Sequence, residues 1–188
     1  MIEARKRFLR RMWWWHNRTL VFIDESGVNL SLTRAEGRAP RGERLIDAVP
    51  AGRWENYTVI AGLREDGIIA PMMLPGAMNS ECLRIWVRES LAPALKPGDI
   101  VVWDNLNIHN DVEIAEMIER RGARLEFLPP YSPDLNPIEK AWSKMKSVLR
   151  KLKARTREAL VDALGTALRA ISKQDCIGWF RHAGYTLP

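Results

Sequence analysis

Short apolar runs along the chain predict the strands of an α/β domain. Runs of four apolar residues at 20–23 and 100–103 have the length and the β-branched and aromatic content of buried strands. Segments 57–63 and 67–74 flank a short polar stretch and predict a β-hairpin, and a further strand is expected over 124–128. Strands in hairpin order, followed by alternating helices and strands, predict a mixed sheet.

Helical spacing of apolar residues fills most of the remaining chain. The clearest stripe joins Ile138, Ala141, Trp142, Met145, Leu149 and Leu152 at the 3.6-residue period of a helix. The helices are predicted over 79–91, 111–121, 137–152 and 156–171. A stretch rich in Gly, Pro and Arg at 33–56 predicts an extended loop. The expected division is a basic, aromatic N-terminal arm over 1–18 and one domain over 19–188.

Composition narrows the class of protein without naming a function. A chain of 188 residues with 46% hydrophobic and 28% charged residues fits one ordinary soluble domain. The net charge of +6 favours a polyanionic partner, although surplus Lys and Arg can equally serve solubility. Two cysteines indicate a reducing cytoplasm, and the sequence contains neither a membrane-length apolar run nor a secretory leader. We therefore expect a cytoplasmic protein that does not bind membranes.

Two aspartates directly follow the two buried apolar runs. Asp24 follows residues 20–23, and Asp104 follows residues 100–103. If the two strands are neighbours, the carboxylates lie close together, and a divalent cation such as Mg²⁺ or Mn²⁺ would offset their repulsion. The alternative is that each aspartate only starts a turn.

Glu139 also has a structural interpretation. Asn136, Pro137 and Glu139 suit the N-cap, first and third positions of a helix, which would make Glu139 the acid of a capping box. Glu139 also borders the apolar stripe, from which a side chain can reach the strand ends. The two interpretations are compatible.

A family resemblance connects the three acids. The segments LVFIDES, WDNLNIH and LPPYSPDLNPIEKAWSKMK occur in this order, and 34 residues separate Asp104 from Glu139. In these motifs and this interval the chain resembles the DDE transposases of the mariner and related bacterial insertion-sequence group. The resemblance implies an RNase H-like (retroviral-integrase-like) fold with a five-stranded mixed sheet flanked by helices. It also implies that Asp24, Asp104 and Glu139 are the catalytic triad and hold two Mg²⁺ or Mn²⁺ ions.

The implied activity is metal-dependent DNA strand cleavage and strand transfer that moves an insertion sequence. Water attacks first, and the freed 3′-hydroxyl then attacks target DNA at the same site. His109 matches another family position, where it either orients a phosphate or water near the metals or caps the following loop. The expected location is the bacterial cytoplasm, in association with the nucleoid.

A nearly acid-free basic stretch begins directly after Glu139. We expect its residues to contact DNA phosphates, although charged helix faces are often merely solvated. The expected DNA-binding residues are Lys140, Lys144, Lys146, Arg150, Lys151 and Lys153.

The expected partners are transposon-end and target DNA and a second copy of the chain in a homodimer. Only about 18 residues precede the first predicted strand. A helix-turn-helix module is therefore expected from a separate subunit or from a frameshift-fused N-terminal half. The alternatives to a transposase are an inactive remnant that only binds or assembles on DNA, and a general RNase H-like nuclease.

Overall fold

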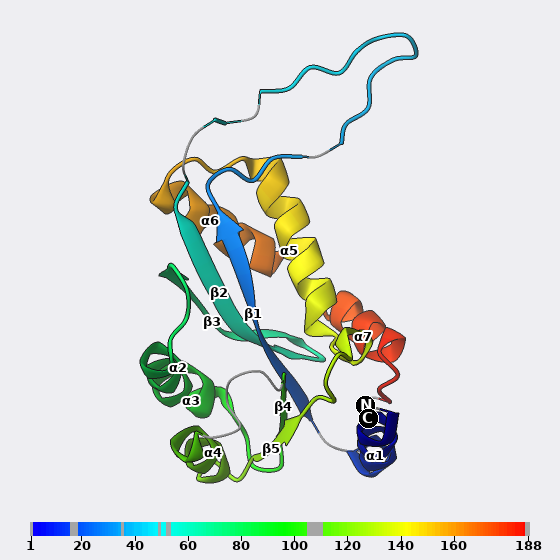
Figure 1. Cartoon of the computed structure of the whole chain (residues 1–188), viewed down its shortest axis with the longest axis vertical. Coiled ribbons are helices and arrows are strands. Elements are labelled where there is room, and N and C mark those ends of the chain that lie inside the picture. The colour runs from blue at the N-terminus through cyan, green and yellow to red at the C-terminus, as the bar shows by residue number, and fades with distance from the viewer. Residues whose placement is uncertain are drawn as a thin grey trace.

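A five-stranded mixed sheet forms the centre of the molecule, as Figure 1 shows. The computed structural model describes residues 2–15, 19–34, 36–48, 50–51, 54–104 and 111–186. The strands are β1 (Leu20–Asn29), β2 (Asn56–Arg64), β3 (Gly67–Pro75), β4 (Ile100–Trp103) and β5 (Arg124–Phe127), in the spatial order β3-β2-β1-β4-β5. In the hairpin, β2 pairs antiparallel with β1 and β3 pairs antiparallel with β2, whereas β4 pairs parallel with β1 and β5 pairs parallel with β4. The predicted mixed sheet is confirmed.

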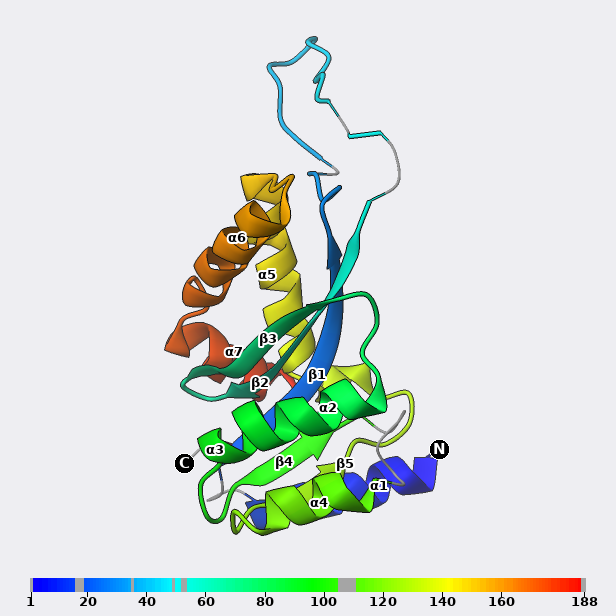
Figure 2. The ribbon, with the colours of Figure 1, turned by 90° about the vertical axis from the view of Figure 1, so that its left-hand side faces the viewer.

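Helices cover both faces of this sheet (Figure 2). One face carries α5 (Ile138–Leu152), α6 (Arg157–Arg169) and α7 (Lys173–His182), together with α1 (Ile2–Met12). The other carries α4 (Val112–Glu119) and a longer helix, in which α2 (Ser80–Trp86) continues through a π-helical turn (Val87–Leu91) into α3 (Ala92–Ala94). Successive strand residues point to opposite faces, so Phe22 belongs to the first core and Ile23 to the second.

Two helices were not predicted from the sequence. Helix α7 follows the two predicted C-terminal helices, and its polar start and Gly178 obscure the apolar pattern. The local signal for it is a capping box, in which the Ser172 side chain accepts from the Asp175 N–H and the Asp175 side chain accepts from the Ser172 N–H. Within the predicted arm, α1 and a 3₁₀ turn, η1 (Trp13–Trp15), pack on the sheet through the buried side chains of Phe8 and Trp15.

The first strand is longer than predicted. The apolar run ends at Ile23, but β1 continues to Asn29 because residues 22–29 pair with β2. Ser26 and Val28 are buried in this extension. The chain between β1 and β2 then projects far beyond the sheet in both views (Figures 1 and 2). Within the described residues, no helix is both long and apolar enough to cross a bilayer.

Candidate active site

The stagger between β1 and β4 brings Asp24 next to Asp104. The two strands pair in parallel from Leu20 opposite Ile100 to Ile23 opposite Trp103, where β4 ends. Asp24 and Asp104 are the next residues along each strand. Asp24 was predicted to end a strand, but it lies inside β1, opposite Ala61 of β2. There β1 continues past the end of its shorter neighbour β4, and Asp24 is half-buried.

Helix α5 brings Glu139 to the same edge. Trp142 is buried on the apolar face of α5, and its indole Nε1–H donates to the Asp24 carboxylate over 3.1 Å. Glu139 lies three residues before Trp142, so the two side chains are neighbours on the helix surface. The helix contact that fixes Asp24 therefore also places Glu139 near it.

The charges of the other two carboxylates influence Asp24. The pKa of Asp24 is raised to about 7, mainly by burial and in smaller part by the negative charges of Glu139 and Asp104. Hydrogen bonds from the Glu25 backbone N–H and from Trp142 oppose this shift because they favour the ionised form. A bound cation would favour ionised Asp24 in the same way.

The three acids lie near one another, but their side chains are not close enough to coordinate one metal ion together. Among the described residues, no three His, Cys, Asp or Glu side chains lie close enough together to hold a metal ion. Repulsion between carboxylates acts over about 4–6 Å, whereas a coordinating oxygen lies about 2.0–2.6 Å from its ion. The donor set fits a hard divalent cation, provided that the side chains can close around it.

A cavity of about 270 Å³ adjoins two of the acids. Its lining consists of Asp104, Glu139 and most of the segment from Leu128 to Asn136. This segment contains three prolines and the exposed Tyr131, whose φ of 54° is left-handed. The carboxylates are therefore reachable from solvent.

The capping-box interpretation of Glu139 is wrong. Helix α5 begins at Ile138 with Pro137 as its N-cap, and a proline side chain has no hydrogen-bonding group. Glu139 is the second helical residue rather than the third, and its side chain is exposed. The fixed φ of Pro137 starts this helix, so the Glu139 side chain is available for another role.

The predicted DNA-binding residues have different surroundings. Lys144 forms an ion pair with Asp175, and Lys153 forms one with Asp47. Lys140 and Lys151 are exposed. Lys146 and Arg150 line an open groove, described below. His109 lies outside the described residues.

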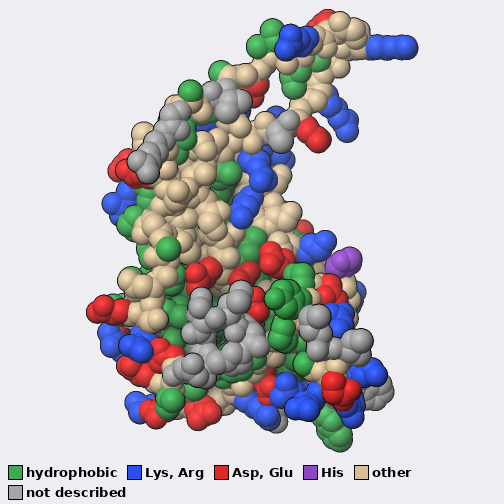
Figure 3. All heavy atoms as spheres, in the orientation of Figure 1, with side chains coloured by type: hydrophobic (Ala, Val, Ile, Leu, Met, Phe, Trp, Pro, Cys, Tyr) green, Lys and Arg blue, Asp and Glu red, His purple; other side chains and the backbone are tan. Residues whose placement is uncertain are grey.

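The groove has a volume of about 600 Å³ and lies between α5 and the far half of β1. The rest of its lining includes Asn56 and Thr58 at the start of β2, and Gly76 and Ala77 in the turn after β3. Figure 3 shows Lys and Arg side chains on this face between the projecting loop and a group of acidic side chains.

Trp142 is the residue whose role the sequence did not indicate. Its place in the apolar stripe predicted a core side chain, and it is buried. The stripe could not show which group its indole N–H would meet, because Asp24 lies 118 residues away in the chain. The only available signal was its position one helical turn after Glu139.

Comparisons with known proteins show which family and which fold this chain resembles. The model of the family described as DDE superfamily endonuclease matches residues 19–161. The Tc1 transposase of Caenorhabditis elegans is 32% identical over 74 residues, which are 39% of this chain and 27% of that protein.

Solved structures of similar fold are those of the Mos1 transposase. Its paired-end complex with the left transposon end has a TM-score of 0.77 at 18% identity, covering 96% of this chain and 57% of that chain. The catalytic domain of Mos1 mariner transposase has a TM-score of 0.64 at 16% identity, covering 96% and 83%. The Mos1 mariner paired-end complex with Mn has a TM-score of 0.69 at 17% identity, covering 96% of this chain and 56% of that chain. The fold is thus RNase H-like, and it is shared with the Mos1 structures. This chain spans little more than half of the Mos1 chain in the paired-end complex, and the match to Tc1 transposase covers about a quarter of that protein.

Proposed function

The chain belongs to the DDE superfamily endonuclease family, and from that premise we propose that it is a transposase catalytic domain that cuts and joins DNA strands to move an insertion sequence. The observation that carries this proposal is the meeting of Asp24, Asp104 and Glu139 at one edge of the sheet. The electrostatic effect of Glu139 and Asp104 on the Asp24 pKa supports that meeting.

Asp24, Asp104 and Glu139 are the proposed metal ligands, with two Mg²⁺ or Mn²⁺ ions between them. Structures of Mos1 are described with Mn and with Mg. When bound, the ions would activate the attacking oxygen and stabilise the leaving oxygen at the scissile phosphate. Other groups of the chain support these ligands: the indole N–H of Trp142 and the backbone N–H of Glu25 donate to Asp24 and favour its ionised form.

DNA is the proposed substrate, bound as transposon end and as target. The basic groove beside α5 supports this proposal, because Lys146 and Arg150 continue along the helix away from the carboxylates. We also propose a homodimer, which is the partner that the family resemblance implies. A helix-turn-helix module, in a longer chain or in a separate subunit, would then select the transposon ends.

The test is a strand-cleavage assay on supercoiled plasmid that carries the element's ends. We expect nicking with Mn²⁺ or Mg²⁺ and none with EDTA. Asp24→Asn, Asp104→Asn and Glu139→Gln should each abolish nicking, because each substitution removes a charged ligand. Their DNA affinity, measured with EDTA present, should stay near that of the wild type.

Glu25→Gln is the matched control. It removes a carboxylate directly beside Asp24 in β1, and we expect nicking at the wild-type rate. Full cleavage by any of the three triad variants would contradict the site assignment. Preferential cutting of an RNA–DNA hybrid would instead indicate a general RNase H-like nuclease, and binding without metal-dependent cutting would indicate a DNA-binding remnant.

A further inference from the structure

The segment leading into Glu139 is held from outside the sheet by the N-terminal helix. This segment comprises a 3₁₀ turn, η3 (Pro133–Leu135), followed by Asn136 and Pro137. The Arg5 guanidinium of α1 binds the Asp134 carboxylate with both terminal nitrogens, one of them over 2.9 Å. Such a two-point contact fixes direction as well as distance.

The C-terminal segment holds the same turn from another side. The Tyr185 hydroxyl donates to the Leu135 backbone carbonyl over 2.7 Å in a buried contact. The Tyr185 ring packs edge-on against Phe22 and Phe180, with centroids 4.8 and 6.1 Å away. Tyr185 is therefore fixed by the core and can restrain Leu135.

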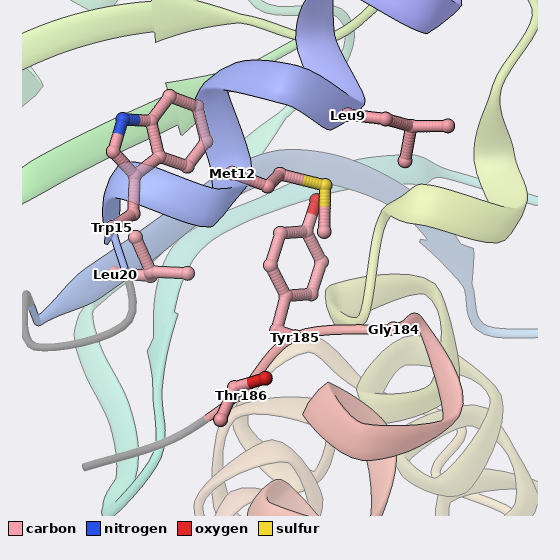
Figure 4. Close-up of a pocket in the computed structure, with 7 residues that line it drawn as sticks. All are labelled: Leu9, Met12, Trp15, Leu20, Gly184, Tyr185 and Thr186. Atoms are coloured by element: carbon pink, nitrogen blue, oxygen red, sulfur yellow. The ribbon is translucent and has the colours of Figure 1, made fainter.

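Helix α1 has its own anchors on the domain. Phe8 is buried and meets the Trp15 ring edge-on at 5.4 Å, while Arg11 pairs with the buried Glu126 over 3.1 Å. Figure 4 shows that the second half of α1 and the C-terminal segment face each other across a cavity of about 440 Å³. The two restraints on the turn therefore come from different elements, α1 and the C-terminal segment.

We propose that Arg5 is a positioning residue for Glu139, acting through Asp134, and that Tyr185 restrains the same segment. Backbone bonds connect the turn to the helix start: Asn136 N–H donates to Pro133 over 3.0 Å, and Glu139 N–H donates to Asn136 over 3.3 Å. Pro133 and Asn136 of the same segment line the cavity together with Asp104 and Glu139. The three acids are not close enough to coordinate one ion as they stand. Small shifts of this segment therefore change how readily the three carboxylates can coordinate a cation.

This inference rests on the proposed metal site, and its test measures metal binding as well as cleavage. Mn²⁺ binding to the DNA-free protein is measured by calorimetry for Arg5→Met, Asp134→Asn and the double variant. An exposed ion pair contributes at most about 1 kcal/mol, so each single variant should weaken Mn²⁺ binding about two- to fivefold. The double variant should be no worse than either single variant, because both substitutions break the same contact.

The matched control lies on the same helix. Arg10 pairs with Glu3 within α1, so Arg10→Met removes the same charge without loosening the turn. Arg10→Met should leave Mn²⁺ binding unchanged. Arg5→Lys keeps the positive charge but cannot bind the Asp134 carboxylate with two nitrogens, so it should recover only part of the Mn²⁺ affinity that Arg5→Met loses. Tyr185→Phe should also weaken Mn²⁺ binding, and thermal melting of each variant monitors folding.

Two outcomes separate this inference from the proposed function. If Glu139→Gln weakens Mn²⁺ binding but Arg5→Met does not, positioning by Arg5 is refuted and the metal site stands. If Glu139→Gln leaves Mn²⁺ binding unchanged, the site assignment itself fails. Equal losses for Arg5→Met and Arg10→Met would mean that only the charge of α1 matters, which also overturns the inference.

Discussion

A single indole N–H connects the core of the molecule with its candidate site. Trp142 is buried in the main hydrophobic core, yet its Nε1–H donates to Asp24. Partners that orient a metal ligand commonly affect metal affinity by about 10- to 100-fold. We therefore expect Trp142→Phe, which keeps an aromatic ring but removes the donor, to weaken Mn²⁺ binding about tenfold in a calorimetric titration.

Trp179→Phe provides the comparison for this prediction. Trp179 lies on α7 and packs partly buried against the same core. Its substitution makes a similar change in size without touching Asp24, and Mn²⁺ binding should remain at the wild-type value. Wild-type Mn²⁺ affinity in Trp142→Phe would show that the indole contact is purely structural.

The sequence allowed the three acids to be predicted but not the contacts that hold them. Asp24, Asp104 and Glu139 stand in local motifs, and their surroundings can be interpreted one segment at a time. The Trp142–Asp24 and Arg5–Asp134 contacts join residues 118 and 129 positions apart. The pattern of apolar residues within one segment cannot predict such contacts, because they depend on how the folded helices and strands pack together.

At the scale of elements, the strongly patterned ones were predicted and the weakly patterned ones were not. Strand β4 and helix α5 match their apolar run and stripe closely. The second half of β1 lacks an apolar run, and only its pairing with β2 makes it a strand. Helix α7 was missed because its start is polar, and tertiary contacts stabilise that start.

One such contact makes the stability of α7 depend on pH. The Lys144 ammonium, followed by the backbone N–H and hydroxyl of Ser172, lowers the pKa of Asp175 to about 2. An aspartate in the unfolded chain has a pKa of about 3.9. The stabilisation is therefore complete above that pH and is lost as the pH falls toward about 2. Asp175→Asn should therefore lower the free energy of unfolding by about 1 kcal/mol at pH 7.

The measurement is urea unfolding of both proteins from pH 7 downward. The difference between wild type and Asp175→Asn should shrink between about pH 4 and about pH 2 as the wild-type carboxylate is protonated. Asp162→Asn, an exposed change on α6, should show little difference at any pH. A difference between wild type and Asp175→Asn that stayed constant down to pH 2 would rule out the ionised pair as its cause.

At the scale of the whole molecule, the candidate site and the basic groove lie along one helix. With a rise of about 1.5 Å per residue, Lys146 lies about 10 Å and Arg150 about 16 Å along α5 from Glu139. Base pairs are spaced about 3.4 Å along duplex DNA, so a duplex following α5 would meet these residues about three and five base pairs from the scissile phosphate. Lys144 and Lys153 form ion pairs with Asp175 and Asp47, and their ammonium groups are therefore less available for contact with DNA phosphates.

Salt dependence of binding tests this path directly. Each phosphate contact contributes about 0.9 to the slope of log affinity against log salt concentration, so Lys146→Ala with Arg150→Ala should reduce the slope by about 1.8. Affinity is measured by fluorescence anisotropy on duplex DNA with EDTA present, which separates phosphate contact from metal binding. Lys151→Ala removes the same charge from the exposed residue next to Arg150, and we expect it to leave the slope unchanged because Lys151 does not line the groove. If Lys151→Ala alone reduced the slope as much as Arg150→Ala alone, DNA binding would depend on the overall charge of α5, and the groove would not be the path of the DNA.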